Sequence, residues 1–91
     1  MHTSFQNSTI LITGASSGFG EETARQFAQA GARLILLARR RERLEALQQE
    51  FHKAFHTECG IIAANITDFN LIEKELQRIE NSFGMPDILI N

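Results

Sequence analysis

A glycine-rich stretch, TGASSGFG at residues 13–20, constrains the fold of this chain more than any other feature. It follows a short apolar run, Thr9 to Thr13, which predicts a buried strand. A helical segment comes next, and we expect it to begin near Gly18 and to be capped at its C-terminus by Gly31. A strand that leads through a glycine loop into a helix is typical of a sheet built from βαβ units.

The same alternation continues to the end of the chain. Further strands are expected at residues 33–38, 60–64 and 87–90. Further helices are expected over residues 40–56 and from Thr67 or Asp68 to the stop at Gly84 and Pro86. Each helix has apolar residues at helical spacing: Phe19, Thr23, Ala24, Phe27 and Ala28 in the first, Leu44, Leu47, Phe51 and Phe55 in the second, and Ile72, Leu76, Ile79 and Phe83 in the third.

The strands are too apolar to be half-exposed, which predicts a parallel sheet covered by helices. The order βαβαβαβ predicts an α/β fold, a Rossmann-like doubly wound sheet with strand order 3-2-1-4. Right-handed crossovers then place the first two helices on one face of the sheet and the third on the other. The switch point lies between the first and fourth strands, and ligands bind there, beyond the carboxyl ends of the strands.

Composition excludes several classes of function. The formal net charge of −2 carries no basic excess, so we expect no binding to nucleic acid. The start, MHTSFQNSTILITG, lacks the features of a signal peptide, and the longest apolar run, Leu34 to Ala38, is too short to cross a bilayer. We therefore expect a cytoplasmic protein without a membrane partner. Cys59 is the only cysteine, which we interpret as a small, reduced, buried residue.

The glycine loop predicts a phosphate-binding site, because a helix N-terminus presents unpaired N–H groups and a partial positive charge. Gly14 would allow the tight turn, Gly18 the approach of a phosphate, and Gly20 close packing of the helix on the sheet. Ser16 and Ser17 add hydroxyls that can donate to phosphate or ribose. The spacing G-x-x-x-G-x-G is neither the G-x-G-x-x-G of other dinucleotide folds nor a P-loop. A plain glycine turn is the alternative, and the order of strand, loop and helix favours phosphate binding.

The end of the second strand predicts which dinucleotide binds. An acidic residue there would hold the 2′-hydroxyl of NAD, but Ala38 stands at that place, followed by Arg39 and Arg40. Guanidinium groups match the geometry of phosphate, so the pair favours the 2′-phosphate of NADP. A solvated basic run is the alternative. Arginines at a helix N-terminus oppose the helix dipole, however, and an anionic partner relieves that conflict.

Other candidates for chemistry are weak. His52 and His56 are spaced like two metal ligands on one helix, but no carboxylate or cysteine at ligand spacing supports them. We interpret them as partly exposed residues beside the Phe51–Phe55 stripe. Asp68 is better interpreted as a helix N-terminal residue than as a catalytic acid. We predict no metal site and no serine nucleophile.

With these residues identified, the chain resembles the short-chain dehydrogenases/reductases. The matches are TGASSGFG at 13–20, the arginine pair at 39–40, NITD at 65–68 and DILIN at 87–91. The resemblance implies an NAD(P)(H)-binding fold and reversible hydride transfer between alcohol and carbonyl. It also implies the roles of single residues: Gly14, Ser16, Ser17, Gly18, Phe19 and Gly20 line the pyrophosphate and ribose, Asn65 accepts from the adenine amino group, Ile66 contacts the adenine, and Asn91 is the first residue of the family's NNAG segment.

One departure from the family is large. Its catalytic Ser, Tyr and Lys lie beyond the NNAG segment, and this chain contains no Tyr. We therefore interpret residues 1–91 as a partial NAD(P)-binding domain, the NADP(H)-binding portion of a short-chain oxidoreductase, inactive alone because the catalytic and substrate-binding part is absent. The alternatives are a nucleotide-binding regulatory module without chemistry and a fragment that only self-associates. Since 87–91 would form an open sheet edge, we expect a homo-oligomer through the truncated sheet.

Overall fold

The computed structural model describes residues 5–91; the signal-peptide interpretation falls in part on residues 1–4, which lie outside the described residues. The elements are β1 (Thr9–Thr13), α1 (Gly18–Gln29), β2 (Arg33–Ala38), α2 (Arg41–Phe55), β3 (Cys59–Ala63), α3 (Phe69–Phe83) and β4 (Ile88–Ile90). The expected order is confirmed. β3 begins one residue earlier than expected and β4 one residue later.

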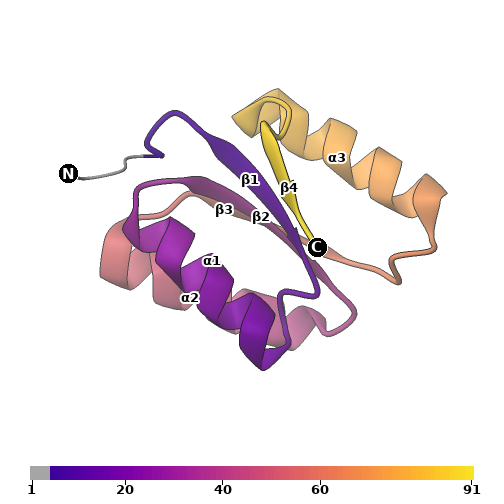
Figure 1. Cartoon of the computed structure of the whole chain (residues 1–91). Helices are drawn as coiled ribbons and strands as arrows, with labels where there is room; N and C mark the ends of the chain where they lie inside the picture. Colours follow the sequence, from indigo (N-terminus) through magenta and orange to yellow (C-terminus); the bar gives the residue numbers. More distant parts are fainter. Residues whose placement is uncertain (1–4) are drawn as a thin grey trace.

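The strands form one parallel sheet in the predicted order β3-β2-β1-β4. Helices α1 and α2 cover one face of it and α3 covers the other, which confirms the doubly wound, Rossmann-like arrangement (Figure 1). In the register, Thr13 lies beside Leu37, and Ile12 lies beside Ile90. The carboxyl ends of β1, β2 and β4 therefore meet at one edge of the sheet.

The apolar core has two layers, one on each face of the sheet. Between the sheet and helices α1 and α2 lie Ile10, Ile12, Leu34, Leu36, Ala24, Ala28, Leu44, Leu47 and Phe51. Between the sheet and α3 lie Ile35, Leu37, Ile62, Ala64 and Ile79. Because β2 is central and covered on both faces, its residues from Leu34 to Ala38 are all buried, as its continuous apolar run predicts.

Two expectations about burial are wrong. Phe19 was expected on the apolar face of α1, but its side chain is 80% exposed, and the buried residues of this helix are Gly20, Ala24 and Ala28. The buried residues are spaced four apart, and Phe19 lies one position before this row, beside the buried face of the helix. In β4, the edge strand of the described sheet, Leu89 is 57% exposed.

The helix ends follow the sequence signals. Asp68 caps α3, which confirms its interpretation as a helix N-terminal residue. Ser17, whose hydroxyl is predicted from the sequence to face a ligand, caps α1 instead. Gly31 follows the last residues of α1 with φ 92°, and its N–H donates to the carbonyl of Ala28 at 3.0 Å. Across residues 5–91 we find no helix with the length and apolar character needed to cross a membrane.

Candidate functional site

The turn between β1 and α1 depends on Gly14. Its φ of 64° lies in the left-handed region, which glycine adopts without the steric cost that a side chain would bring. The turn is anchored to the neighbouring strand, because the N–H of Ala15 donates to the carbonyl of Leu37 at 3.3 Å. The glycine loop is therefore fixed at the edge where the strands end.

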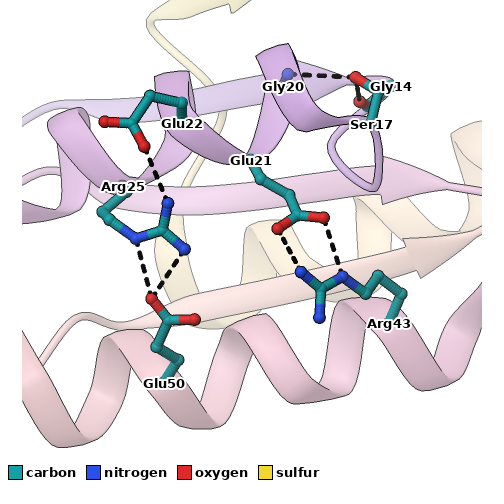
Figure 2. Close-up of polar contacts among 8 residues, drawn as sticks. All are labelled: Gly14, Ser17, Gly20, Glu21, Glu22, Arg25, Arg43 and Glu50. Atoms are coloured by element: carbon teal, nitrogen blue, oxygen red, sulfur yellow. Dashed lines mark hydrogen bonds and ion pairs between the residues drawn. The ribbon is translucent and has the colours of Figure 1, made fainter.

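Ser17 and Gly20 complete the loop by contacts with Gly14 (Figure 2). The hydroxyl of Ser17 donates to the Gly14 carbonyl at 2.9 Å and accepts from the N–H of Gly20 at 3.1 Å. A Cβ at Gly20 would overlap the carbonyl oxygen of Gly14, so only glycine fits there. Sequence analysis expected Gly20 to pack on the sheet, whereas the contact that requires glycine is with the loop itself. The Ser17 hydroxyl already uses its one proton inside the loop.

Gly18 is the first residue of helix α1, and its backbone is accessible. A Cβ built at Gly18 meets no atom within 4 Å, so the backbone of the first helical turn is open to an approaching group. The first N–H groups of a helix have no partner inside it, and the dipole adds a partial positive charge. This end of α1 therefore offers hydrogen bonds and a favourable field to an anion.

In the described part of the chain, two hollows flank the loop. The larger, of about 390 Å³, is lined by Thr13, Gly14, Ser16, Leu37, Ala38, Arg39, Arg40, Ala64 and Ile66. The smaller, of about 200 Å³, is lined by Ile12, Thr13, Gly14, Ser17, Phe19, Gly20, Thr23, Ile90 and Asn91. Because both include Thr13 and Gly14, a single extended ligand that crosses the loop could reach both.

The larger hollow has a basic rim. Arg39 and Arg40 are exposed and follow directly after β2. Ile66 lies on the same hollow with half of its side chain exposed, which provides a flat apolar surface. Among residues 5–91, neither arginine takes part in an ion pair. Two free guanidinium groups beside an apolar surface suit a ligand with a phosphate and a ring.

Two of the predicted residues lie outside both hollows: Gly18, on the open side of the helix, and Asn65. The amide oxygen of Asn65 accepts from the N–H of Thr67 at 3.0 Å and from its hydroxyl at 2.9 Å. This local turn occupies both acceptor positions of the oxygen. An adenine amino group would have to displace one of these hydrogen bonds in order to bind there.

Sequence analysis missed several residues that line the hollows. Thr13, Leu37, Ala64 and Ile90 all lie at or just beyond the carboxyl ends of strands. The topology could have identified them, since ligands of such sheets bind at that edge. Thr13 also fixes a predicted site residue, because its hydroxyl donates to the side-chain oxygen of Asn91 at 3.3 Å.

The first turns of α1 and α2 are joined by an ion pair (Figure 2). The Nε of Arg43 donates to Glu21 at 2.8 Å, and a second N–H of the same guanidinium binds the other carboxylate oxygen. The hydrogen bond from Arg43 is the main cause that lowers the pKa of Glu21. The pair neutralises Arg43, whereas Arg39, Arg40 and Arg41 form no ion pair within residues 5–91, and of these three Arg39 and Arg40 line the larger hollow.

The weaker candidates gain no support from the geometry. Among residues 5–91, no three His, Cys, Asp or Glu side chains lie close enough together to hold a metal ion. His52 and His56 are exposed, in agreement with their interpretation as residues outside the core. Cys59 is a free, buried thiol, as expected, and burial raises its pKa to about 12. A thiol with this pKa is not a nucleophile near neutral pH.

Comparison with known proteins places these features in context. A sequence profile of the short chain dehydrogenase family matches residues 8–91. The serine 3-dehydrogenase of Agrobacterium fabrum is 51% identical over 83 residues, which are 91% of this chain and 32% of that protein. The L-sorbose reductase of Gluconobacter frateurii, solved with NADPH and L-sorbose, superimposes on 100% of this chain and 35% of its own with a TM-score of 0.90 at 30% identity.

A Haemophilus influenza oxidoreductase solved with bound NAD is similar to nearly the same extent, with a TM-score of 0.88 at 27% identity over 97% of this chain and 31% of its own. Likeness of fold alone therefore does not separate NADP from NAD, and the side chains at the rim must do so. The chain spans about one third of the length of these three relatives.

Proposed function

The chain belongs to the short chain dehydrogenase family, and from this premise we propose that residues 1–91 are a partial NAD(P)-binding domain that binds NADP(H). The complete enzyme would transfer hydride between this cofactor and an alcohol or carbonyl substrate. The observation that carries the proposal is the pair of free arginines, Arg39 and Arg40, on the rim of a hollow that begins at the glycine loop.

The pyrophosphate would lie at the N-terminus of α1. The open backbone at Gly18 admits it, and the unpaired N–H groups of the first turn, including that of Phe19, would donate to its oxygens. Gly14 and Gly20 hold the turn closed beneath it. Ser16 lines the larger hollow, where its hydroxyl would donate to phosphate or ribose, whereas Ser17 acts chiefly as the helix cap.

The adenosine part would lie in the larger hollow. The adenine ring would pack against Ile66, beside Asn65, and the 2′-phosphate would bind the guanidinium groups of Arg39 and Arg40. Ala38 leaves space and no negative charge where a carboxylate would repel that phosphate. The nicotinamide part would extend into the smaller hollow, toward Asn91.

The bound cofactor supplies a hydride, and the reaction also needs a proton donor placed against the substrate oxygen. The family's donor is a tyrosine, and these 91 residues contain none. We therefore propose that the polypeptide of residues 1–91 binds the cofactor without turnover. Steady NADPH oxidation by this polypeptide with simple carbonyl compounds, in a preparation free of other reductases, would contradict this.

A titration of the double variant Ala38→Asp, Arg39→Leu tests the cofactor assignment. The variant loses one phosphate fork and gains a charge that repels the 2′-phosphate. A charge-assisted hydrogen bond contributes about 1.5–3 kcal/mol, so the Kd for NADPH should rise more than tenfold. The Kd for NADH should not rise, because the new carboxylate can accept a hydrogen bond from the 2′-hydroxyl. Arg41→Leu, which removes a neighbouring arginine outside the hollow, is the matched control. An unchanged Kd for NADPH in the double variant would show that the assignment is wrong.

We also propose that the polypeptide of residues 1–91 self-associates through β4. This strand pairs with β1 on one side, and within the described sheet its other side is unpaired. Leu89 is largely exposed there, and an unprotected apolar edge favours strand pairing between copies. Sedimentation across a concentration series tests this, and a monomer at high micromolar concentration would contradict it. Leu89→Lys should weaken the association.

A further inference from the structure

Within residues 5–91, two ion-paired contacts join α1 to α2, and they differ in position (Figure 2). One joins Glu21 to Arg43 in the first turns of the two helices, next to the glycine loop. The other joins Arg25 to Glu50, 2.9 Å apart, farther along both helices. The first contact therefore lies beside the proposed cofactor site, and the second connects the same helices away from it.

The start of α2 is held differently from the starts of α1 and α3. Ser17 and Asp68 cap α1 and α3 with side-chain hydrogen bonds, whereas the residue at the corresponding position of α2, Arg40, makes none. Residues 39–40 alone connect β2 to α2, so both arginines are tied by the backbone to the first turn of this helix. Arg40 is also coupled directly to that turn, since its carbonyl accepts from the N–H of Leu44 at 3.1 Å.

The Glu21–Arg43 pair has a geometry that fixes orientation as well as distance. Two N–H groups of one guanidinium meet both oxygens of one carboxylate, and such a fork restrains the plane of each group. The Glu21 side chain is 15% exposed and the Arg43 side chain 44% exposed, so the glutamate is the better-packed partner. Glu21 directly follows Gly20, whose packing on Gly14 fixes it in turn.

We propose that Glu21 and Arg43 are positioning residues, whose ion pair sets the distance between the phosphate site at the glycine loop and the guanidinium groups of Arg39 and Arg40. The inference rests on the proposed NADP(H) function. The pyrophosphate and the 2′-phosphate belong to one ligand, so both contacts form only when the two protein parts have the matching separation. The pair thus supports the preference for NADPH over NADH without touching the cofactor.

The direction in which two single variants change the ratio of NADPH to NADH affinity distinguishes a positioning role from a simple effect of charge. In Glu21→Gln, the loss of a negative charge alone would favour the 2′-phosphate. In Arg43→Gln, the loss of a positive charge alone would disfavour it. If the pair positions Arg39 and Arg40, both variants lower the ratio of NADPH to NADH affinity, by about tenfold, as expected for one displaced charge-assisted hydrogen bond. The double variant should lower the ratio no further than either single one, because both remove the same interaction.

Isothermal titration calorimetry of the whole chain with NADPH and NADH measures these ratios. Arg25→Gln and Glu50→Gln are the matched controls, since they break the contact between the same two helices away from the site. They should lower the melting temperature slightly and leave the ratio unchanged. Opposite changes in the two test variants, no change in either, or an equal change in the controls would overturn the inference. A wild-type chain that binds neither dinucleotide would instead refute the proposed function, and the inference with it.

Discussion

Gly20→Ala and Gly18→Ala should separate the packing role of the glycine loop from its role in binding. A Cβ on Gly20 would overlap the carbonyl oxygen of Gly14 and lie 2.9 Å from its carbonyl carbon. The contact with the oxygen is the tighter one, at 2.2 Å, and Cβ atoms essentially never approach another atom closer than 3.0 Å, so the helix or the loop must shift by about 0.8 Å at least. These are backbone atoms, which cannot rotate away as a flexible side chain can. At Gly18 the same added methyl group meets no atom within 4 Å.

The free energies of the two changes follow from this difference. Overpacking of this kind costs about 1–3 kcal/mol, and the better helix propensity of alanine returns up to about 1 kcal/mol. Gly20→Ala should therefore destabilise the chain by roughly 1–2 kcal/mol, which lowers the melting temperature of a domain of this size by roughly 5–15 °C. Gly18→Ala should be neutral or slightly stabilising. Its methyl group would nevertheless occupy the path by which a phosphate approaches the backbone.

Thermal unfolding followed by circular dichroism, together with an NADPH titration, checks both expectations. Gly20→Ala should lose stability and affinity together, whereas Gly18→Ala should lose affinity alone. The steric reasoning fails if Gly20→Ala has the melting temperature of the wild type, or if Gly18→Ala has a melting temperature as low as that of Gly20→Ala. If Gly18→Ala binds NADPH as the wild type does, the phosphate does not approach at that residue.

Other changes test single contacts. Ser17→Ala removes the helix cap and the contact to Gly14, so the free energy of unfolding, measured by urea denaturation, should fall by about 1 kcal/mol; Ser16→Ala is the control and should change it little. Asp87→Ala removes the acceptor of the Thr9 N–H, 2.9 Å away, and should cost about 1 kcal/mol by the same measurement, because it removes a partly buried hydrogen bond. Burial raises the pKa of the Cys59 thiol to about 12. The thiol of the folded chain should therefore resist iodoacetamide at pH 8 and react with it once the chain is unfolded in urea. Rapid labelling without denaturant would contradict the burial of Cys59.

The fold was predictable because its signals are local and strong. The continuous apolar runs identified β1 to β3, and Gly31 and Asp68 mark helix ends with specific hydrogen bonds. The cap at Ser17 was not predicted, because its hydroxyl was assigned to a ligand. The order β3-β2-β1-β4 followed from general rules of handedness. The burial of Phe19 was predicted wrongly because helical spacing allows two adjacent rows, one through Phe19, Thr23 and Phe27 and one through Gly20, Ala24 and Ala28. The second row is the buried one, and it begins at Gly20, which packs against the backbone of Gly14.

The site was only partly predictable, because some polar groups of the motifs form hydrogen bonds within the protein and are not free to bind a ligand. The hydroxyl of Ser17 and the amide oxygen of Asn65 both bind within their own turns, which leaves them less available to a ligand than their positions indicate. The strand-end residues that line the hollows, such as Leu37 and Ala64, carry no polar group and so form no motif. They can be identified only from the fold, which brings the carboxyl ends of neighbouring strands together.

The four arginines within residues 39–43 show how the fold gives different roles to residues of the same type. Arg43 projects from the first turn of α2 toward α1, where Glu21 occupies the facing position and neutralises it. Arg39 and Arg40 precede the helix and border the larger hollow, beyond the reach of the acidic residues on α1 that pair with Arg43 and Arg25. A ligand phosphate would therefore meet two free guanidinium groups held by a third that is already paired. The acidic residues of α1 thus help determine which arginines are left for the ligand, although none of them lines the hollow that it would occupy.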